Sequence, residues 1–281
     1  ENHLTSNSNE MSNIMNRYSA EIEPKLASCI SPTNKSIKDY LGKPIENAFS
    51  FAPVIPIEIQ NEINTLSNSK SYGLYSCPAK LLKLGCPVLE ELLSDILNKS
   101  IETRTYPDKL KIAKITPIYK ADEDNNPENY RPISLSIFNK IFEKIIYNRL
   151  ISFVEKYDLL CDSQYGFRGK HNTEHAIIDI QKIQCNMEKG KYTCGIFIDL
   201  KKAFDTVNHD ILLCILHHYG IRGVFHDWFR SYLSSRKQTV CINGSILNSE
   251  LTPCGIPQGR LLLVLEATYK LYFAESKQIC R

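Results

Sequence analysis

The 281-residue sequence has no C-x-x-C pair among its ten cysteines, no long apolar run and no strong charge of either sign. The cysteine and histidine spacings exclude a zinc finger. Free, reduced cysteines are therefore expected, in an intracellular protein of the cytoplasm or nucleus that is not secreted. The longest apolar run, Leu261–Leu265, is far shorter than the roughly 18 residues of a membrane helix, so we expect no membrane partner.

The bulk composition is that of an ordinary globular protein. Hydrophobic residues make up 43%, charged residues 23%, and the formal charge is +3. These values exclude a coiled coil, a collagen-like repeat and a wholly disordered chain. The length fits one large or two small domains. A small net charge is compatible with nucleic-acid binding, because basic residues can line a single cleft.

The apolar patterns predict an α+β protein. Residues 1–40, rich in Ser and Asn, are expected to be a disordered or linker lead-in. Two runs around an acidic, Asn-rich turn predict a hairpin, as does Asn243–Gly244 between two shorter runs. A further apolar strand is expected at 192–200. Apolar stripes of helical period predict the helices, which are expected at about 57–67, 78–84, 88–103, 137–157, 172–189, 208–219 and 224–233.

Asp199 is the first candidate for chemistry, because it follows the apolar run Gly195–Ile198. A carboxylate at the end of a buried strand is costly unless it is paired or binds a cation. The alternative is that Asp199 caps the segment that begins near Lys201. Two-metal phosphoryl transfer needs several carboxylates, so Asp199 alone could not hold both ions.

Three other groups of residues are candidates for binding. Lys114, Lys120 and Arg131 flank the acidic turn and could clamp a triphosphate, or form a solvated surface. The loop from Gln164 to Arg168, which includes Phe167, could stack on nucleic-acid bases or be a packed turn. The glycines of the loop 255–259 would allow a backbone to approach a ligand closely, which by itself is weak support for a site.

These segments, in this order, resemble the reverse transcriptase of LINE-type, jockey-like non-LTR retrotransposons. The resemblance runs from Pro53 to Gly259 and depends on five motifs. They are Lys114-x-x-Pro-x-x-Lys120, Asn129–Tyr–Arg–Pro–Ile–Ser134, Gln164–Tyr–Gly–Phe–Arg168, Phe197–Ile–Asp–Leu–Lys–Lys–Ala–Phe–Asp205 and Gly255–Ile–Pro–Gln–Gly259. Each motif alone is moderately specific, and their common order makes the match specific.

The resemblance implies the fold and the roles of particular residues. The fold would be a right-hand polymerase with fingers and a partial palm, the thumb being absent. The implied division is 41–190 for an N-terminal extension and fingers, 191–259 for the partial palm, and 260–281 for a divergent tail. Asp199 and the carbonyl of Leu200 would bind Mg²⁺. The incoming nucleotide would contact Lys120, Arg131, Leu200, Phe204, Gln258 and Gly259, with Phe204 as the steric gate under the sugar.

The implied activity is RNA-directed DNA synthesis, with an RNA template, a DNA primer and deoxynucleoside triphosphates as partners. The family has a Phe/Tyr–Ala–Asp–Asp hairpin after the Pro-Gln-Gly loop, which supplies further metal-binding carboxylates. Here the nearest similarity is Tyr272–Phe–Ala–Glu–Ser276, with Glu275 and Ser276 in place of the aspartates. We therefore expect this chain to be catalytically incomplete. The alternative is a non-catalytic RNA- or DNA-binding remnant of a retroelement.

Overall fold

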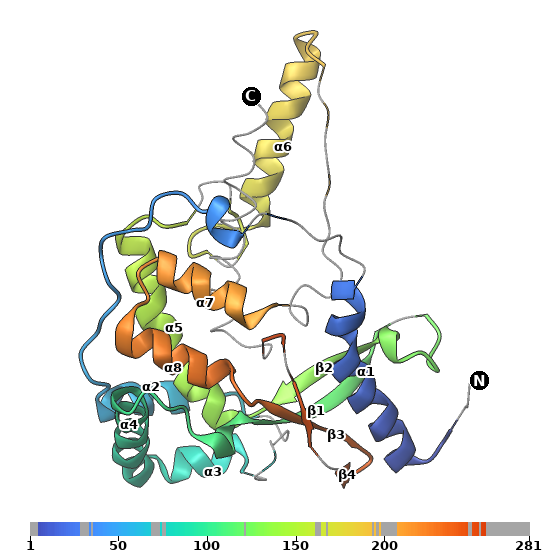
Figure 1. Cartoon of the computed structure of the whole chain (residues 1–281), viewed down its shortest axis with the longest axis vertical. Helices are drawn as coiled ribbons and strands as arrows, with labels where there is room; N and C mark the ends of the chain where they lie inside the picture. Colours follow the sequence, from blue (N-terminus) through green and yellow to red (C-terminus); the bar gives the residue numbers. More distant parts are fainter. Residues whose placement is uncertain are drawn as a thin grey trace.

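The computed structural model describes residues 5–28, 34, 36–68, 74, 77–120, 122–160, 164–166, 168–192, 194, 197, 207–246, 249–252 and 254–256. Within these residues it is an α+β protein with eight α-helices and one mixed sheet (Figure 1). The α+β class is therefore confirmed. The helices are α1 (Ser8–Ser28), α2 (Pro56–Thr65), α3 (Ala79–Leu84), α4 (Cys86–Glu102), α5 (Ile137–Lys156), α6 (Thr173–Glu188), α7 (His209–His218) and α8 (Gly223–Leu233).

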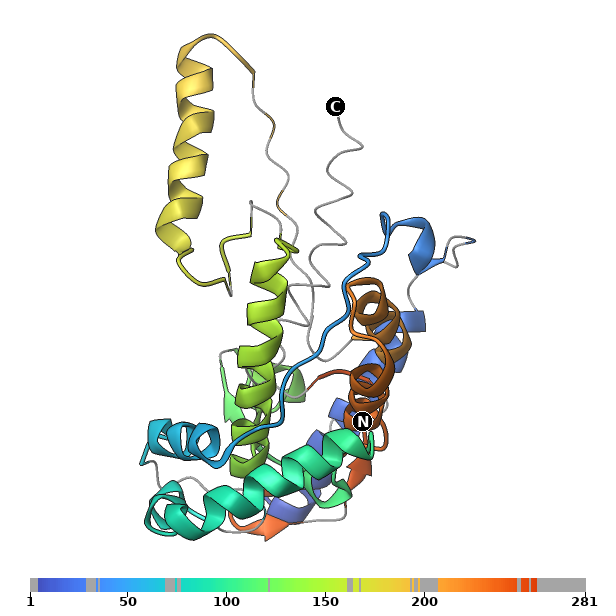
Figure 2. The same cartoon turned by 90° about the vertical axis from the view of Figure 1, so that its left-hand side faces the viewer.

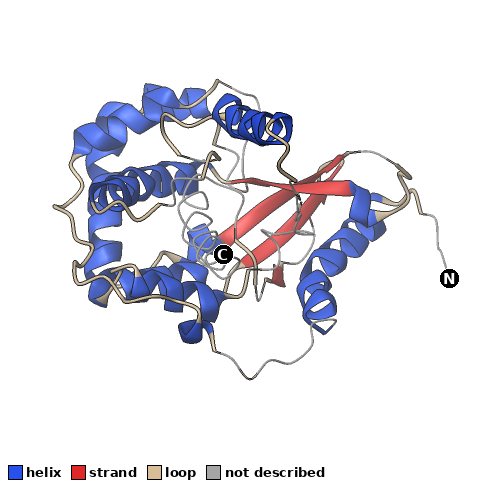
Figure 3. Ribbon diagram, turned by 90° about the horizontal axis from the view of Figure 1, so that it is seen from above, coloured by secondary structure: helices blue, strands red, loops and turns tan. Residues whose placement is uncertain are grey.

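The sheet has the strand order β2-β1-β3-β4, with β5 paired to β3. β1 is antiparallel to β2 and parallel to β3, whereas β4 and β5 are antiparallel to β3. Figure 3 shows the strands between one helix near the N-terminus and most of the other helices. The strands are β1 (Ile112–Tyr119), β2 (Tyr130–Leu135), β3 (Lys237–Ile242), β4 (Ser245–Ile246) and β5 (Glu250–Leu251).

Both hairpins predicted from the sequence are confirmed. In the first, Pro117 lies opposite Pro132, three positions along the ladder from the bonded end where the Lys120 N–H donates to the Asn129 carbonyl. The alternation of an antiparallel ladder makes Pro117 and Pro132 a non-hydrogen-bonded pair, so neither proline needs an N–H there. In the second, Asn243 and Gly244 both have positive φ, as the tight turn requires.

Helix α1 is where the structure departs from the sequence-based expectation. Residues predicted to belong to a disordered lead-in form a 21-residue helix that packs against β3, β4 and β5. Met15, Tyr18 and Ile22 follow one another at helical spacing and line the space between α1 and the sheet. This apolar stripe is short, and Ser and Asn residues are frequent between its members. The helix is therefore stable only when it packs on the sheet.

An aromatic cluster in the core joins the segment before β1 to the helix before β3. Tyr106 packs edge-on against Trp228 and Tyr232, with ring centroids 5.4 and 5.0 Å apart. The Tyr106 N–H donates to the Ser231 hydroxyl at 2.9 Å, and the Trp228 indole donates to the Ser100 hydroxyl at 2.9 Å. Because these groups are buried, each polar atom needs its partner. The cluster therefore fixes α8 against the end of α4.

The core is continuous across residue 190, where the fingers and palm were expected to divide. Phe49 packs edge-on against Phe153 and Phe225 at 5.4 and 4.9 Å, so segments from both sides share one cluster. Gly220, with φ +86°, lies so close that a Cβ would be 2.3 Å from the Asn47 carbonyl oxygen. The division into fingers and palm at residue 190 stays a prediction. Among the described residues, the core extends across this position.

The remaining helices agree with the sequence patterns to within a few residues. Asn208 caps α7, since its side chain accepts from the N–H groups of Asp210 and Ile211. α6 projects away from the rest of the molecule (Figures 1 and 2). The strand expected at 192–200 lies largely outside the described residues. The cysteines in the described part of the chain are free, and no described helix is long and apolar enough to cross a membrane.

Glu143, on α5, is buried beside the aromatic cluster of Tyr106, Trp228 and Tyr232. It leads to a prediction about how stability depends on pH. Its carboxylate accepts the Tyr232 hydroxyl at 2.7 Å, and burial raises its pKa above the ordinary value near 4.5, despite the opposing effects of Tyr232, Arg236 and Lys140. A raised pKa means that the native state holds the proton more tightly than the unfolded chain. Stability from this group is therefore full at low pH and declines as pH rises through the folded-state pKa.

We expect Glu143→Gln to become more stable relative to the unmodified protein as pH rises above about 5, so that the difference in unfolding free energy changes by at most about 1.4 kcal/mol per pH unit. Urea titrations across this range measure the difference. Glu155→Gln, an exposed change on the same helix, is the control. Parallel pH profiles for Glu143→Gln and the unmodified protein would contradict the prediction.

Candidate functional site

Basic side chains share one face of the β1–β2 hairpin. Lys114 and Lys120 are six positions apart in sequence, so their side chains point to the same side of the hairpin. Arg131 on β2 pairs with Ile118, which lies on that side too. Lys120 and Arg131 are exposed, whereas Lys114 is partly buried. Lys120 and Arg131 are diagonal neighbours across the two strands. Such neighbours are roughly 7–8 Å apart, so the Lys120 and Arg131 side chains can reach one ligand.

The turn between β1 and β2 is fastened by side chains rather than left loose. The Tyr130 hydroxyl donates to the Asp124 carbonyl at 2.8 Å, and the Tyr119 hydroxyl donates to the Asp122 carbonyl. The Asn129 amide donates to the Glu123 carbonyl at 2.8 Å. The Tyr119 and Tyr130 rings lie on the opposite face from Lys120, with centroids 5.6 Å apart. The hairpin thus holds its basic face in a defined position.

Gln164 and Arg168 are turned toward the protein. Gln164 is 9% exposed, and its amide donates to the Gly166 carbonyl at 3.1 Å. The Arg168 side chain is 17% exposed and forms an ion pair with Asp158 at 3.9 Å. This arrangement fits the packed-turn alternative, and a role in nucleic-acid binding stays a prediction for these two residues.

Several residues of the predicted site lie outside the described part of the chain: Phe167, Asp199, Leu200, Phe204, Gln258 and Gly259. Their mutual geometry is therefore not stated. Within the described residues, no group of three or more His, Cys, Asp or Glu side chains is placed to hold a metal ion.

The structure does bring together the segments that flank these residues. Gly255, which precedes Pro257 and Gln258 by a few residues, donates its N–H to the Val207 carbonyl at 3.0 Å. His209, the first residue of α7, contacts the Gly255 carbonyl through Nε2 at 2.7 Å. Because a carbonyl only accepts, Nε2 must carry the proton. Gly255 has φ +76°, which favours glycine.

His209 is a positioning residue that the sequence did not reveal. A single histidine at the start of a helix has no distinctive spacing, and its partner lies 46 residues further along the chain. Together the two hydrogen bonds hold the segment after Asp205 against the segment before Gln258. The described residues Val207 and His209 are therefore held to Gly255.

Comparison with known proteins agrees with this arrangement. The family described as reverse transcriptase (RNA-dependent DNA polymerase) matches residues 118–263, just over half of the chain. The matched range contains Arg131, His209 and the loop at Gly255. This chain belongs to the reverse transcriptase family.

Three similar curated proteins come from mobile elements of Drosophila melanogaster. The chain is 32% identical over 229 residues to a probable RNA-directed DNA polymerase from transposon BS, covering 80% of this chain and 25% of that protein. It is 28% identical, with the same coverage, to the probable polymerase from transposon X-element. It is 27% identical over 235 residues to the RNA-directed DNA polymerase from mobile element jockey, covering 81% of this chain and 25% of that protein.

The chain is thus a reverse transcriptase domain related to the polymerases of the non-LTR retrotransposons BS, X-element and jockey. It spans about a quarter of the length of these relatives.

The contact between His209 and Gly255 leads to a prediction about stability. His209→Leu removes the donor to the Gly255 carbonyl, and we expect a loss of about 1 kcal/mol in unfolding free energy, the usual net value of a hydrogen bond. His209→Gln keeps an N–H donor and should recover part of this loss. Urea denaturation measures both variants. A His209→Leu protein as stable as the unmodified one would show that the contact contributes nothing.

Proposed function

We propose that this chain is the part of a non-LTR retroelement polymerase that binds the incoming deoxynucleoside triphosphate during RNA-directed DNA synthesis. The observation that carries this proposal is the position of Lys120 and Arg131. They are exposed, share one face of a fastened hairpin, and lie opposite the face that α1 covers. The family match begins at residue 118 and includes both.

The chemistry of these two residues suits a triphosphate. Arg131 presents a planar guanidinium that can donate two parallel hydrogen bonds to phosphate oxygens. Lys120 is a compact positive charge beside it. Both can also compensate negative charge that develops on the transferred group. Among the described residues, no carboxylate of the tip is hydrogen-bonded to either side chain. The tip itself is held by side chains that donate to backbone carbonyls.

The remaining roles are proposed by residue from the family resemblance. The Asp199 carboxylate and the Leu200 carbonyl are hard oxygen donors of the kind that Mg²⁺ prefers. A bound Mg²⁺ would supply positive charge to the phosphoryl oxygens. Phe204 would exclude a ribose 2′-hydroxyl, and Gln258 with Gly259 would pack against the nucleotide and template. We assign 41–190 to the fingers with their N-terminal extension and 191–259 to the palm.

The first prediction concerns nucleotide affinity. We expect Lys120→Gln and Arg131→Gln each to weaken deoxynucleoside triphosphate binding by about 10-fold or more, because each removes a charge-assisted hydrogen bond worth roughly 1.5–3 kcal/mol. Titration with a fluorescent triphosphate, without primer or template, measures the dissociation constants.

Matched controls separate a site from general electrostatics. Lys191→Gln and Arg230→Gln change exposed side chains of the same types elsewhere on the molecule, and both should leave the affinity within about two-fold, because charges beyond a Debye length of about 10 Å are screened in moderate salt. Equal losses in all four variants would contradict a clamp formed by Lys120 and Arg131.

The second prediction concerns polymerisation by the 281-residue chain on its own. After Gly259, residues 260–281 contain Glu266 and Glu275 but no aspartate. Two-metal chemistry needs more carboxylates than Asp199 supplies. Primer extension on an RNA template should therefore be no faster for this chain than for its Asp199→Ala variant.

Either result of that assay is informative. Extension that is lost in Asp199→Ala would overturn the expected incompleteness and would establish the enzyme directly. Without extension, RNA binding tests the alternative of a non-catalytic binding protein. Binding through phosphate contacts would weaken steeply with salt, with a slope near −0.7 per phosphate contacted on a single strand.

A further inference from the structure

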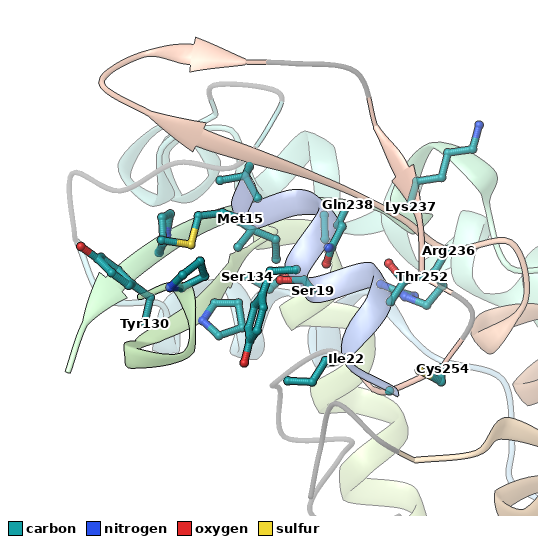
Figure 4. Close-up of a pocket in the computed structure, with 18 of the residues that line it drawn as sticks. Met15, Ser19, Ile22, Tyr130, Ser134, Arg236, Lys237, Gln238, Thr252 and Cys254 are labelled. Carbon is teal, nitrogen blue, oxygen red and sulfur yellow. The ribbon is translucent and has the colours of Figure 1, made fainter. Parts of the chain in front are cut away.

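A cavity of about 100 Å³ lies between α1 and the face of the sheet opposite Lys120. Figure 4 shows Met15 and Tyr130 at one end of it and Arg236, Thr252 and Cys254 at the other. Pro117 and Pro132 form part of its apolar wall. The cavity is thus separate from the proposed nucleotide site, since the sheet lies between them.

Two buried polar side chains at this cavity have donors without partners. Arg236 is 4% exposed and Gln238 is 7% exposed. Neither the Nη2 of Arg236 nor the Nε2 of Gln238 has a hydrogen-bond partner among the residues that the structure describes. A buried donor left unpaired costs roughly 1–3 kcal/mol, so two on one small cavity need a physical explanation.

The rest of Arg236 is firmly held. Its Nη1 donates to the Tyr232 carbonyl at 3.1 Å, its guanidinium lies 4.8 Å from the centre of the Tyr232 ring, and its carbonyl accepts the Thr252 N–H at 2.9 Å. Nη1 is therefore occupied, whereas Nη2 is buried without a hydrogen-bond partner among the described residues. On β3, Gln238 pairs with Ala113, which lines the cavity too, so its side chain projects from the same face.

The charge around the cavity favours an anion. Among the described residues its lining includes the buried guanidinium of Arg236 and no carboxylate, whereas the Lys237 side chain points away from the cavity (Figure 4). Hydroxyl groups of Ser19, Ser134 and Thr252 complete the polar part of the wall. Glu143 interacts with Arg236 electrostatically, and burial raises the pKa of its carboxyl.

We propose that this cavity is a binding site for a phosphate group, held by Nη2 of Arg236 and Nε2 of Gln238. Its size fits a tetrahedral oxyanion of five heavy atoms, because a cavity of about 150 Å³ holds a benzene molecule. A whole nucleotide is too large. The phosphate can be a free ion or the terminal phosphate of a nucleic-acid strand, since both present the same oxygens to the donors.

Occupancy would connect three parts of the chain. Ser19 comes from α1, Gln238 from β3, and Thr252 from the segment that continues to Gly255. A bound phosphate would thereby hold α1 against the segment that leads to Gln258.

Titration of inorganic phosphate into the 281-residue chain, at constant ionic strength with chloride as the balancing anion, tests the site by phosphorus NMR line width. We expect saturable binding with a dissociation constant on the order of 1 mM or lower. Arg236→Gln should weaken it about 10-fold, because a charge-assisted hydrogen bond is lost. Since Arg236 also packs on Tyr232, Gln238→Met is the second variant. It replaces the amide group by an apolar thioether of similar length and should weaken binding about 3-fold or more.

Arg230→Gln, on the exposed surface of α8, is the matched control and should bind phosphate like the unmodified chain. No saturable binding by the unmodified chain would overturn the proposal. Unchanged affinity in a folded Gln238→Met protein, or an equal loss in Arg230→Gln, would overturn it too. The assay uses no primer, template or triphosphate, so its outcome is independent of whether the chain polymerises DNA.

The source of the phosphate is distinguished with two RNA oligonucleotides of one sequence, one with a 5′-phosphate and one with a 5′-hydroxyl. Tighter binding of the phosphorylated strand that Gln238→Met abolishes would support the site and identify a strand end as its occupant. Equal binding of the two strands, together with saturable binding of inorganic phosphate, would support the site and identify the free ion.

Discussion

The parallel pairing of β1 with β3 depends on aromatic packing just before each strand. Tyr106 precedes β1 by six residues and Tyr232 precedes β3 by five, and their rings are 5.0 Å apart. Contact between the two rings sets the register in which Ile112 meets Lys237. A tight turn fixes the register of a hairpin, but parallel strands far apart in sequence have no such turn between them. Their register must therefore be set by contacts in the core.

That pairing gives the sheet two faces with different properties. One face carries Lys120 and Arg131 at the exposed end of the hairpin, and the other is covered by α1 and encloses a small cavity with buried donors. The period-two alternation of strands keeps the faces separate, because a side chain cannot change face without a shift in register. The two proposed ligands, a triphosphate on one face and a phosphate group on the other, would therefore not compete.

Local elements were predictable wherever the determining contacts are close in sequence. The hairpin 112–135 and the turn at Asn243–Gly244 followed from apolar alternation and turn residues. Helix α1 was missed, because Met15, Tyr18 and Ile22 form a stripe too short to stabilise a helix without the sheet. In the site, the basic pair Lys120 and Arg131 was visible as a motif, whereas His209 was not, since its meaning depends on the Gly255 carbonyl that it contacts.

The sequence by itself determined the family, the α+β class and the residues that carry charge at the hairpin. Motifs in a fixed order and short-range periodicity are local features, so they can be recognised without the three-dimensional structure. Only the tertiary structure decided that β3 joins the β1–β2 hairpin, that α1 covers one face, and that Arg236 and Gln238 meet at a cavity. These features come from contacts between segments more than a hundred residues apart. No local pattern encodes such contacts, since each depends on how the whole core packs.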